Sequence, residues 1–100
     1  MIEMGRYCIS IPLLPFKPRL ILMKDNDTGK VSGFLRWWGK SIRLVSIHQK
    51  DDHLIFQFLI QFIVIDFIVY FPAKNMIDGF FDTPIGHYRF KGKRMRNERL

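Results

Sequence analysis

The sequence predicts an all-β fold: an eight-stranded, antiparallel, up-and-down barrel built as two four-strand halves. Clusters of Gly, Pro, Asn and Asp punctuate the chain at short, regular intervals, and no segment carries a helical repeat of about 3.6 residues over a useful length. The segments VSGF at 31–34 and IDGF at 77–80 also share one order of residue types. This repeated order predicts two corresponding strands, the third and the seventh.

Composition sets the size and the number of domains. The chain has 100 residues, of which 48% are hydrophobic and 25% charged, with a formal net charge of +7. These values are typical of one compact domain with a real core rather than of a disordered chain. We expect one domain over residues 1–94 and a basic tail over residues 95–100. A domain this small buries a limited share of its surface, so a homo-oligomer is expected.

Two features of the sequence bear on the compartment. A single cysteine, Cys8, excludes an internal disulfide framework. The first residues lack an apolar run preceded by a basic region, as a signal peptide would have. The sequence therefore predicts a cytoplasmic protein.

Each strand is bounded by a recognisable turn. Three prolines in residues 12–18 forbid a central strand there, and residues 24–30 are rich in Asp, Asn and Gly. Further turns are expected near Gly39, at 49–52, at 72–75 and at 83–86. The expected strands are residues 6–11, 19–23, 31–37, 42–48, 54–60, 63–71, 76–81 and 87–94.

Residues 54–71 are apolar enough to suggest a membrane helix on hydropathy alone. They contain no Ala or Gly and are rich in Ile, Val and Phe, which favour a pleated strand. Gln57, Gln61 and Asp66 would spread polar groups around much of a helix, so we expect two strands joined at Gln61 and Phe62. Both faces of this hairpin stay apolar, which predicts that a second copy covers its outer face. No membrane partner is expected.

Gly33 and Gly79 lie within predicted strands, in rows of apolar residues. A glycine at such a position leaves room for a large neighbouring side chain or permits sharp coiling of the sheet.

Several segments together resemble small bacterial calycin-like proteins, the lipocalin and avidin type of barrel. These segments are GRY at 5–7, the proline-bearing loop after it, residues 20–35, 53–58 and 75–90, and KGKR at 91–94. The resemblance covers about residues 5–94 and implies that an aromatic residue of the first strand packs against an arginine of the last. Tyr7 stands where lipocalins have tryptophan, and Arg94 stands for the arginine, which makes them a barrel-closing pair.

The interior of an eight-stranded barrel either is filled by side chains or holds one small ligand. A packed core and a cavity near one mouth both remain open. If there is a ligand, it is a hydrophobic small molecule, and the residues expected to bind it are Tyr7, Leu35, Trp37, Phe56, Phe58, Phe67, Phe81, Tyr88 and Phe90. The adjacent Trp37 and Trp38 must point to opposite faces, which would put one of them at the rim or at a subunit contact.

No cofactor and no metal site are expected. His48, His53 and His87 lack the spacing of metal ligands, and the loop that begins at Asp25 has Arg36 at position twelve, where a calcium loop needs glutamate. Asp66 is the one carboxylate within an apolar strand, and an interface role is favoured for it.

Two other functions stay open beside a non-enzymatic binding protein. One is a small barrel enzyme that isomerises or cyclises an apolar substrate, with Asp66, Tyr88 or His87 as acid or base. The other is a nucleic-acid module that uses the basic tail. Nucleic acid is not the partner that the sequence favours.

Overall fold

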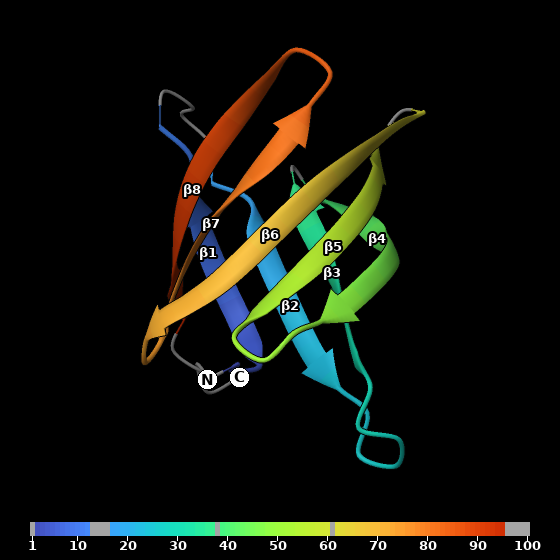
Figure 1. Ribbon diagram of the computed structural model, residues 1–100, viewed down its shortest axis with the longest axis vertical. Coiled ribbons are helices and arrows are strands. Elements are labelled where there is room, and N and C mark those ends of the chain that lie inside the picture. The colour runs from blue at the N-terminus through green and yellow to red at the C-terminus, as the bar shows by residue number, and fades with distance from the viewer. Residues whose placement is uncertain (1, 13–16, 38, 61, 96–100) are drawn as a thin grey trace.

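The computed structural model describes residues 2–12, 17–37, 39–60 and 62–95, and they form a curled antiparallel sheet (Figure 1). Its strands are β1 (Gly5–Ser10), β2 (Arg19–Lys24), β3 (Val31–Trp37), β4 (Lys40–Gln49), β5 (His53–Ile60), β6 (Ile63–Ala73), β7 (Met76–Thr83) and β8 (Gly86–Arg94). Each strand pairs with the next, and β1 also pairs with β8, so the strand order returns to its start. The predicted all-β class and antiparallel sheet are confirmed.

Pairing around this sheet is uneven. The register of β1 with β8 runs only from Tyr7↔Arg94 to Ser10↔Lys91, whereas that of β5 with β6 extends from His53↔Tyr70 to Ile60↔Ile63. The pairing between β5 and β6 is therefore long, whereas only a short seam joins β1 to β8. The finer description, an eight-stranded calycin-like barrel of two four-strand halves, stays a prediction.

The apolar run at 54–71 folds back on itself as β5 and β6, which confirms the two-strand prediction. Phe62 lies in the turn between them, and Gln61 lies outside the described residues. In the part of the chain that the structure describes, no helix is long and apolar enough to span a bilayer.

The core lies inside the curl, where alternate residues of each strand point inward. Five of the nine residues predicted to bind a ligand are at most 1% exposed: Tyr7, Leu35, Phe56, Phe58 and Phe90. The core also contains buried residues that were not among those nine: Ile9, Ile11, Leu20, Leu22, Val31, Leu54, Val69, Phe71 and Ile77. Strand parity alone does not say how deep each residue sits.

Gly33 and Gly79 mark places where two strands approach closely. A Cβ on Gly33 would collide with the backbone carbonyl oxygen of Ile21, and one on Gly79 would collide with that of Ile68. The same Cβ on Gly79 would lie 3.1 Å from the Phe90 ring. At Gly79 the glycine leaves room for the large Phe90 side chain, which is one of the two predicted roles, and at both positions it permits close approach of the neighbouring strand.

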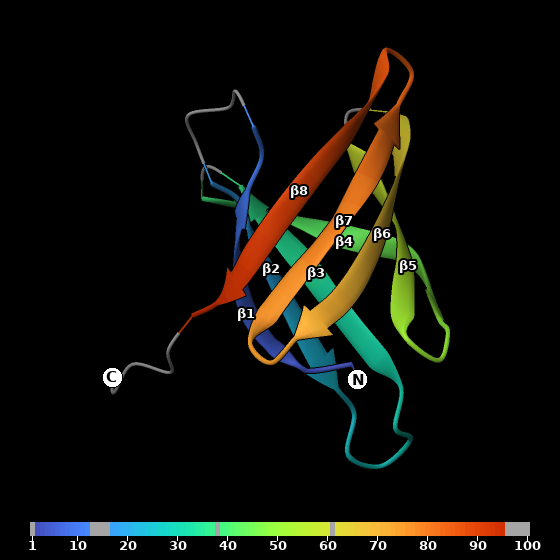
Figure 2. The same ribbon diagram turned by 60° about the vertical axis from the view of Figure 1, so that its left-hand side comes forward.

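The up-and-down order places alternate connections at opposite ends of the sheet (Figures 1 and 2). We call one end of the sheet the hairpin end; at this end β1 joins β2, β3 joins β4, β5 joins β6 and β7 joins β8. We call the other the N-terminal end; it carries the segment before β1 and the remaining turns. The two ends differ sharply in chemistry.

Candidate functional site at the hairpin end

The N-terminal end is covered by the segment that precedes β1. Ile2 and Met4 pack against the core. The Tyr7 hydroxyl donates to the carbonyl oxygen of Glu3 at 2.9 Å, and the Glu3 carboxylate accepts the backbone N–H of Asn75 at 2.8 Å. These bonds fasten the segment to β1 and to the β6–β7 turn, which shields the interior at this end.

Tyr7 and Arg94, the predicted barrel-closing pair, are register partners at the seam between β1 and β8. The Arg94 side chain runs against Gly5, where an added Cβ would lie 2.6 Å from its Nε atom. Burial raises the pKa of Tyr7 to about 12; the nearby Glu3 charge also raises this pKa, and Arg94 partly opposes the rise. Tyr7 is thus a neutral, buried hydroxyl next to a cation.

The hairpin end differs because its inward residues are only partly covered. One residue each from β3, β4, β5 and β6 packs against the core while remaining half-buried: Trp37, Ile42, Ile60 and Ile65. Further out, the side chains of Ile63 and Tyr88 are 42% and 39% exposed. This end therefore offers apolar surface that leads directly into the core.

An aromatic column passes through this surface. The rings of Phe67 and Phe81 stack with centroids 4.8 Å apart and an interplanar angle of 14°. Phe81 stacks in turn on Tyr88, at 5.3 Å and 26°. Phe67 and Phe81 are 5% and 9% exposed, whereas Tyr88 is 39% exposed. The column thus begins in the packed interior and ends in solvent.

The nine residues predicted to bind a ligand fall into two groups. Phe67, Phe81, Tyr88 and the half-buried Trp37 lie toward the hairpin end. The others are fully buried: Tyr7, Leu35, Phe56, Phe58 and Phe90. Phe56 contacts Phe58 with centroids 6.0 Å apart, and Phe58 contacts Phe67 at 4.9 Å. Side chains thus fill the interior around these rings.

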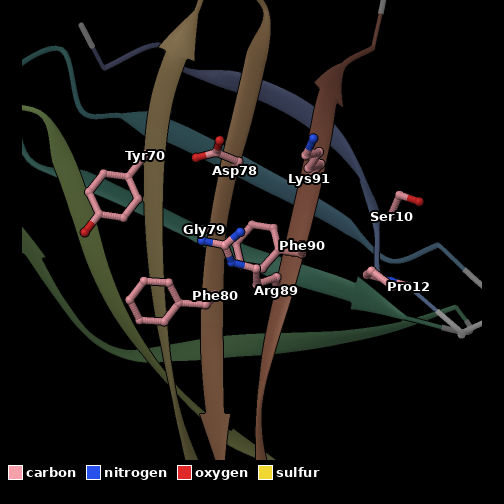
Figure 3. Close-up of a pocket in the computed structure, with 9 residues that line it drawn as sticks. All are labelled: Ser10, Pro12, Tyr70, Asp78, Gly79, Phe80, Arg89, Phe90 and Lys91. Atoms are coloured by element: carbon pink, nitrogen blue, oxygen red, sulfur yellow. The ribbon is translucent and has the colours of Figure 1, made fainter.

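A hollow lies on the outer face of β6–β8 and was not foreseen from the sequence (Figure 3). It encloses about 460 Å³ and is lined by Ser10, Pro12, Tyr70, Asp78, Gly79, Phe80, Arg89, Phe90 and Lys91. The Tyr70 and Phe80 rings lie 6.4 Å apart, and Asp78 and Lys91 are register partners. The aromatic residues of the outer rows were the signal that could have indicated it.

Asp66 faces outward and is exposed. Its carboxylate accepts a hydrogen bond from Gln57 Nε2 at 2.9 Å, and Gln57 Oε1 accepts one from the Ser46 hydroxyl at 2.9 Å. Asp66 is therefore part of a polar chain across the outer face of β4–β6. It is not positioned to act as a base on a molecule held inside the curl.

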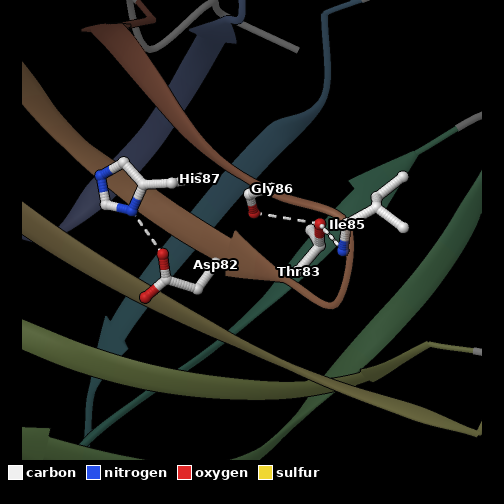
Figure 4. A network of polar contacts seen from close by, with 5 residues as sticks. All are labelled: Asp82, Thr83, Ile85, Gly86 and His87. Carbon is white, nitrogen blue, oxygen red and sulfur yellow. Dashed lines mark hydrogen bonds and ion pairs between the residues drawn. The ribbon is translucent and has the colours of Figure 1, made fainter.

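Two of the three histidines pair with neighbouring carboxylates. His53 Nδ1 lies 2.7 Å from Asp52, and this hydrogen bond lowers the pKa of the Asp52 carboxyl. His87 pairs with Asp82 beside the β7–β8 turn, in which the Thr83 hydroxyl donates to Gly86 and accepts from the Ile85 N–H (Figure 4). Over the described residues, no group of three His, Cys, Asp or Glu side chains could hold a metal ion.

Two predictions fall on parts of the chain that the structure does not describe. Trp38 lies outside the described residues, as do residues 96–100 of the basic tail. No protein-family model, no curated protein and no solved structure matches this chain.

Proposed function

We propose that this protein is a non-enzymatic, calycin-like barrel that binds a flat, apolar small molecule at its hairpin end. The observation that carries this proposal is the column of Phe67, Phe81 and Tyr88, whose rings stack from the core outward. A flat ligand that lies on Tyr88 extends the column by one layer. Such offset stacking contributes about 1 kcal/mol beyond the burial of apolar area.

The surroundings of Tyr88 suit an uncharged, apolar ligand. At the same end of the sheet, Trp37, Ile60 and Ile65 on three further strands are only half-buried, so they present apolar surface beside the core. Covering apolar area contributes about 25 cal/mol per Å². Because the N-terminal end is covered and the interior is filled with rings, the ligand rests at the mouth and does not pass through the barrel.

Exposed apolar residues on the outer face of β5–β6 support a homo-oligomer in which copies associate through this face. Leu59 and Val64 are register partners on that face, and their side chains are 51% and 52% exposed. Apolar pairs of this kind are stabilised when a second copy covers them.

The test of the ligand site is a fluorescence titration with the neutral probe N-phenyl-1-naphthylamine. Tyr88→Ala removes the outer ring of the column and should weaken binding about ten-fold, which corresponds to roughly 1.4 kcal/mol. Tyr70→Ala, which removes a ring from the outer hollow, is the matched control and should leave binding unchanged. Equal affinity of wild type and Tyr88→Ala would overturn the proposal, and a loss confined to Tyr70→Ala would move the site to the outer hollow.

A further inference from the structure

Two turns at the hairpin end present large apolar side chains fully to solvent. Phe62, between β5 and β6, is 99% exposed, and Ile85, between β7 and β8, is 88% exposed. Ile63, next to Phe62, is 42% exposed. Both hairpins project at the same end of the sheet (Figure 2). The tips of that end are therefore apolar, although they make no contribution to the core.

The backbone at Phe62 makes this placement more unusual. Its φ is 71°, in the left-handed region that favours Gly or Asn. The β6–β7 turn at the N-terminal end uses Asn75 at a φ of 65°, and Gly39 has the same geometry between β3 and β4, with a φ of 75°. A phenylalanine at this position adds backbone strain and exposes an aromatic ring, and both effects oppose stability of the isolated chain. A contact outside the chain would explain its presence.

Basic residues lie at the same end of the sheet, on other strands. Arg19, Arg36 and Lys40 belong to the ends of β2, β3 and β4 there, Lys17 precedes β2, and all four are exposed. Arg19 and Arg36 are register partners, an arrangement of like charges that is itself destabilising. Among the described residues, the ion pairs of the structure join only histidines to aspartates, so these four cations are free to contact an external anion.

Most of the acidic residues lie at the N-terminal end of the sheet. Most carboxylates of the described chain lie in the N-terminal segment or in turns at the N-terminal end: Glu3, Asp25, Asp27, Asp51 and Asp52. At the hairpin end, Asp82 is already paired with His87 (Figure 4). Lys24, Lys30, Lys50 and Lys74 offset these carboxylates in the same turns. Among the described residues of the hairpin end, the cations lack such carboxylate neighbours in the turns, so that end combines apolar tips with a net positive charge.

We propose that the hairpin end docks on the surface of a lipid bilayer that contains anionic phospholipid. Phe62 and Ile85 enter the boundary between headgroups and acyl chains, and Lys17, Arg19, Arg36 and Lys40 contact the headgroup phosphates. Surface binding of this kind combines buried apolar area with attraction to anionic lipid. The bilayer is contacted only by turns and adjacent strand ends, and docking does not require a ligand at Tyr88.

The experiment is co-sedimentation with vesicles of phosphatidylcholine alone and of phosphatidylcholine with phosphatidylserine in equal amounts. Wild type should bind the mixed vesicles much more strongly, and added salt should weaken binding. Phe62→Asn should lower partitioning by about ten-fold or more, because burial of the ring is lost. Its thermal midpoint should be equal to or above that of wild type, because Asn suits a positive φ. The matched control, Met76→Asn, removes a side chain that is 42% exposed at the other end and should leave partitioning unchanged.

A second pair of variants tests the contribution of the cations to vesicle binding. Arg36→Gln with Lys40→Gln should lower partitioning into the mixed vesicles about 25-fold, since each cation near an anionic surface contributes about five-fold. Lys24→Gln with Lys50→Gln makes the same charge change at the N-terminal end and should have little effect.

Three results would overturn the proposal. The first is equal binding of Phe62→Asn and wild type to mixed vesicles. The second is binding of single-stranded RNA that needs Arg36 and Lys40 but not Phe62, which would make the cations a nucleic-acid site. The third is absence of vesicle binding with a change in subunit number in Phe62→Asn, which would make the tips a contact between copies.

Discussion

At the scale of single residues, Gly79 determines how tightly β6 and β7 approach. A side chain there would collide with the Ile68 carbonyl oxygen and press on Phe90. We predict that Gly79→Ala lowers the free energy of unfolding by about 2 kcal/mol, the usual scale of overpacking. Gly86→Ala is the control, because its Cβ would meet only the exposed Tyr88 side chain, at 3.2 Å from the hydroxyl. Urea unfolding of both variants tests this, and equal losses would contradict it.

The titration of Tyr7 should lower the free energy of unfolding at alkaline pH. Its pKa is raised from 10.0 to about 12 in the folded protein. Below pH 10 the phenol is protonated in both states, so its contribution is fully present. Between pH 10 and 12 the unfolded chain loses the proton first, so stability falls as the pH rises, by about 3 kcal/mol in total.

Tyr7→Phe provides the comparison for this titration. It removes the titrating hydroxyl together with its bond to Glu3, so the variant should be less stable below pH 10 and should show a shallower fall above it. Urea unfolding across this range measures both effects. An identical alkaline slope in the two proteins would assign the fall to other groups.

At the scale of elements, the β5–β6 hairpin exposes apolar residues on its outer face, which is the contact between copies that we propose. Leu59→Lys with Val64→Lys places charges on that face, and we predict that it shifts the protein from oligomer to monomer with little loss of fold, because both side chains are about half exposed. Met23→Lys, on β2, is the control. Sedimentation equilibrium measures the mass, and a monomeric wild type would count against the proposed interface.

This hairpin also shows how much could be predicted from sequence. Gln57 and Asp66 excluded a helix and indicated the alternation of two strands, and the structure joins these side chains across the outer face. The depth of each residue could not be predicted. Phe90 and Tyr88 share one row of β8, yet Phe90 is 1% and Tyr88 39% exposed, because depth depends on how far each strand extends beyond its neighbours.

The outer hollow was missed for a related reason. Tyr70 and Phe80 lie on different strands, and their approach depends on the register between β6 and β7, which pairs Ile68 with Phe80. Strand parity shows that a side chain points outward. It does not show which outward side chains of two strands come together.

At the scale of the whole molecule, the fold depends on contacts between distant parts of the chain. Tyr7 pairs with Arg94, and Glu3 holds the backbone of Asn75. Folds dominated by such contacts fold slowly, because the loop entropy is lost before the contacts form. We predict refolding in about milliseconds to seconds, measured by stopped-flow tryptophan fluorescence. Refolding within microseconds would indicate that local hairpins alone determine the rate.

The two ends of the molecule also differ in what the sequence reveals. The charges of individual turns are visible in the sequence, but which turns share an end follows only from the strand order. Lys17 and Lys40 are brought to one end because β2 and β4 both begin there. The contrast between an end with apolar tips and unpaired cations and a covered end with mixed charges is a property of the assembled sheet.

The short seam between β1 and β8 has a consequence during protein synthesis. The ribosome produces β1 early, yet one edge of that strand has no partner until Lys91–Arg94 have been made. A product released before that point would display open backbone hydrogen-bonding groups, which recruit other strands. Translation that stalls late in this message should therefore yield aggregates rather than a shortened, folded protein.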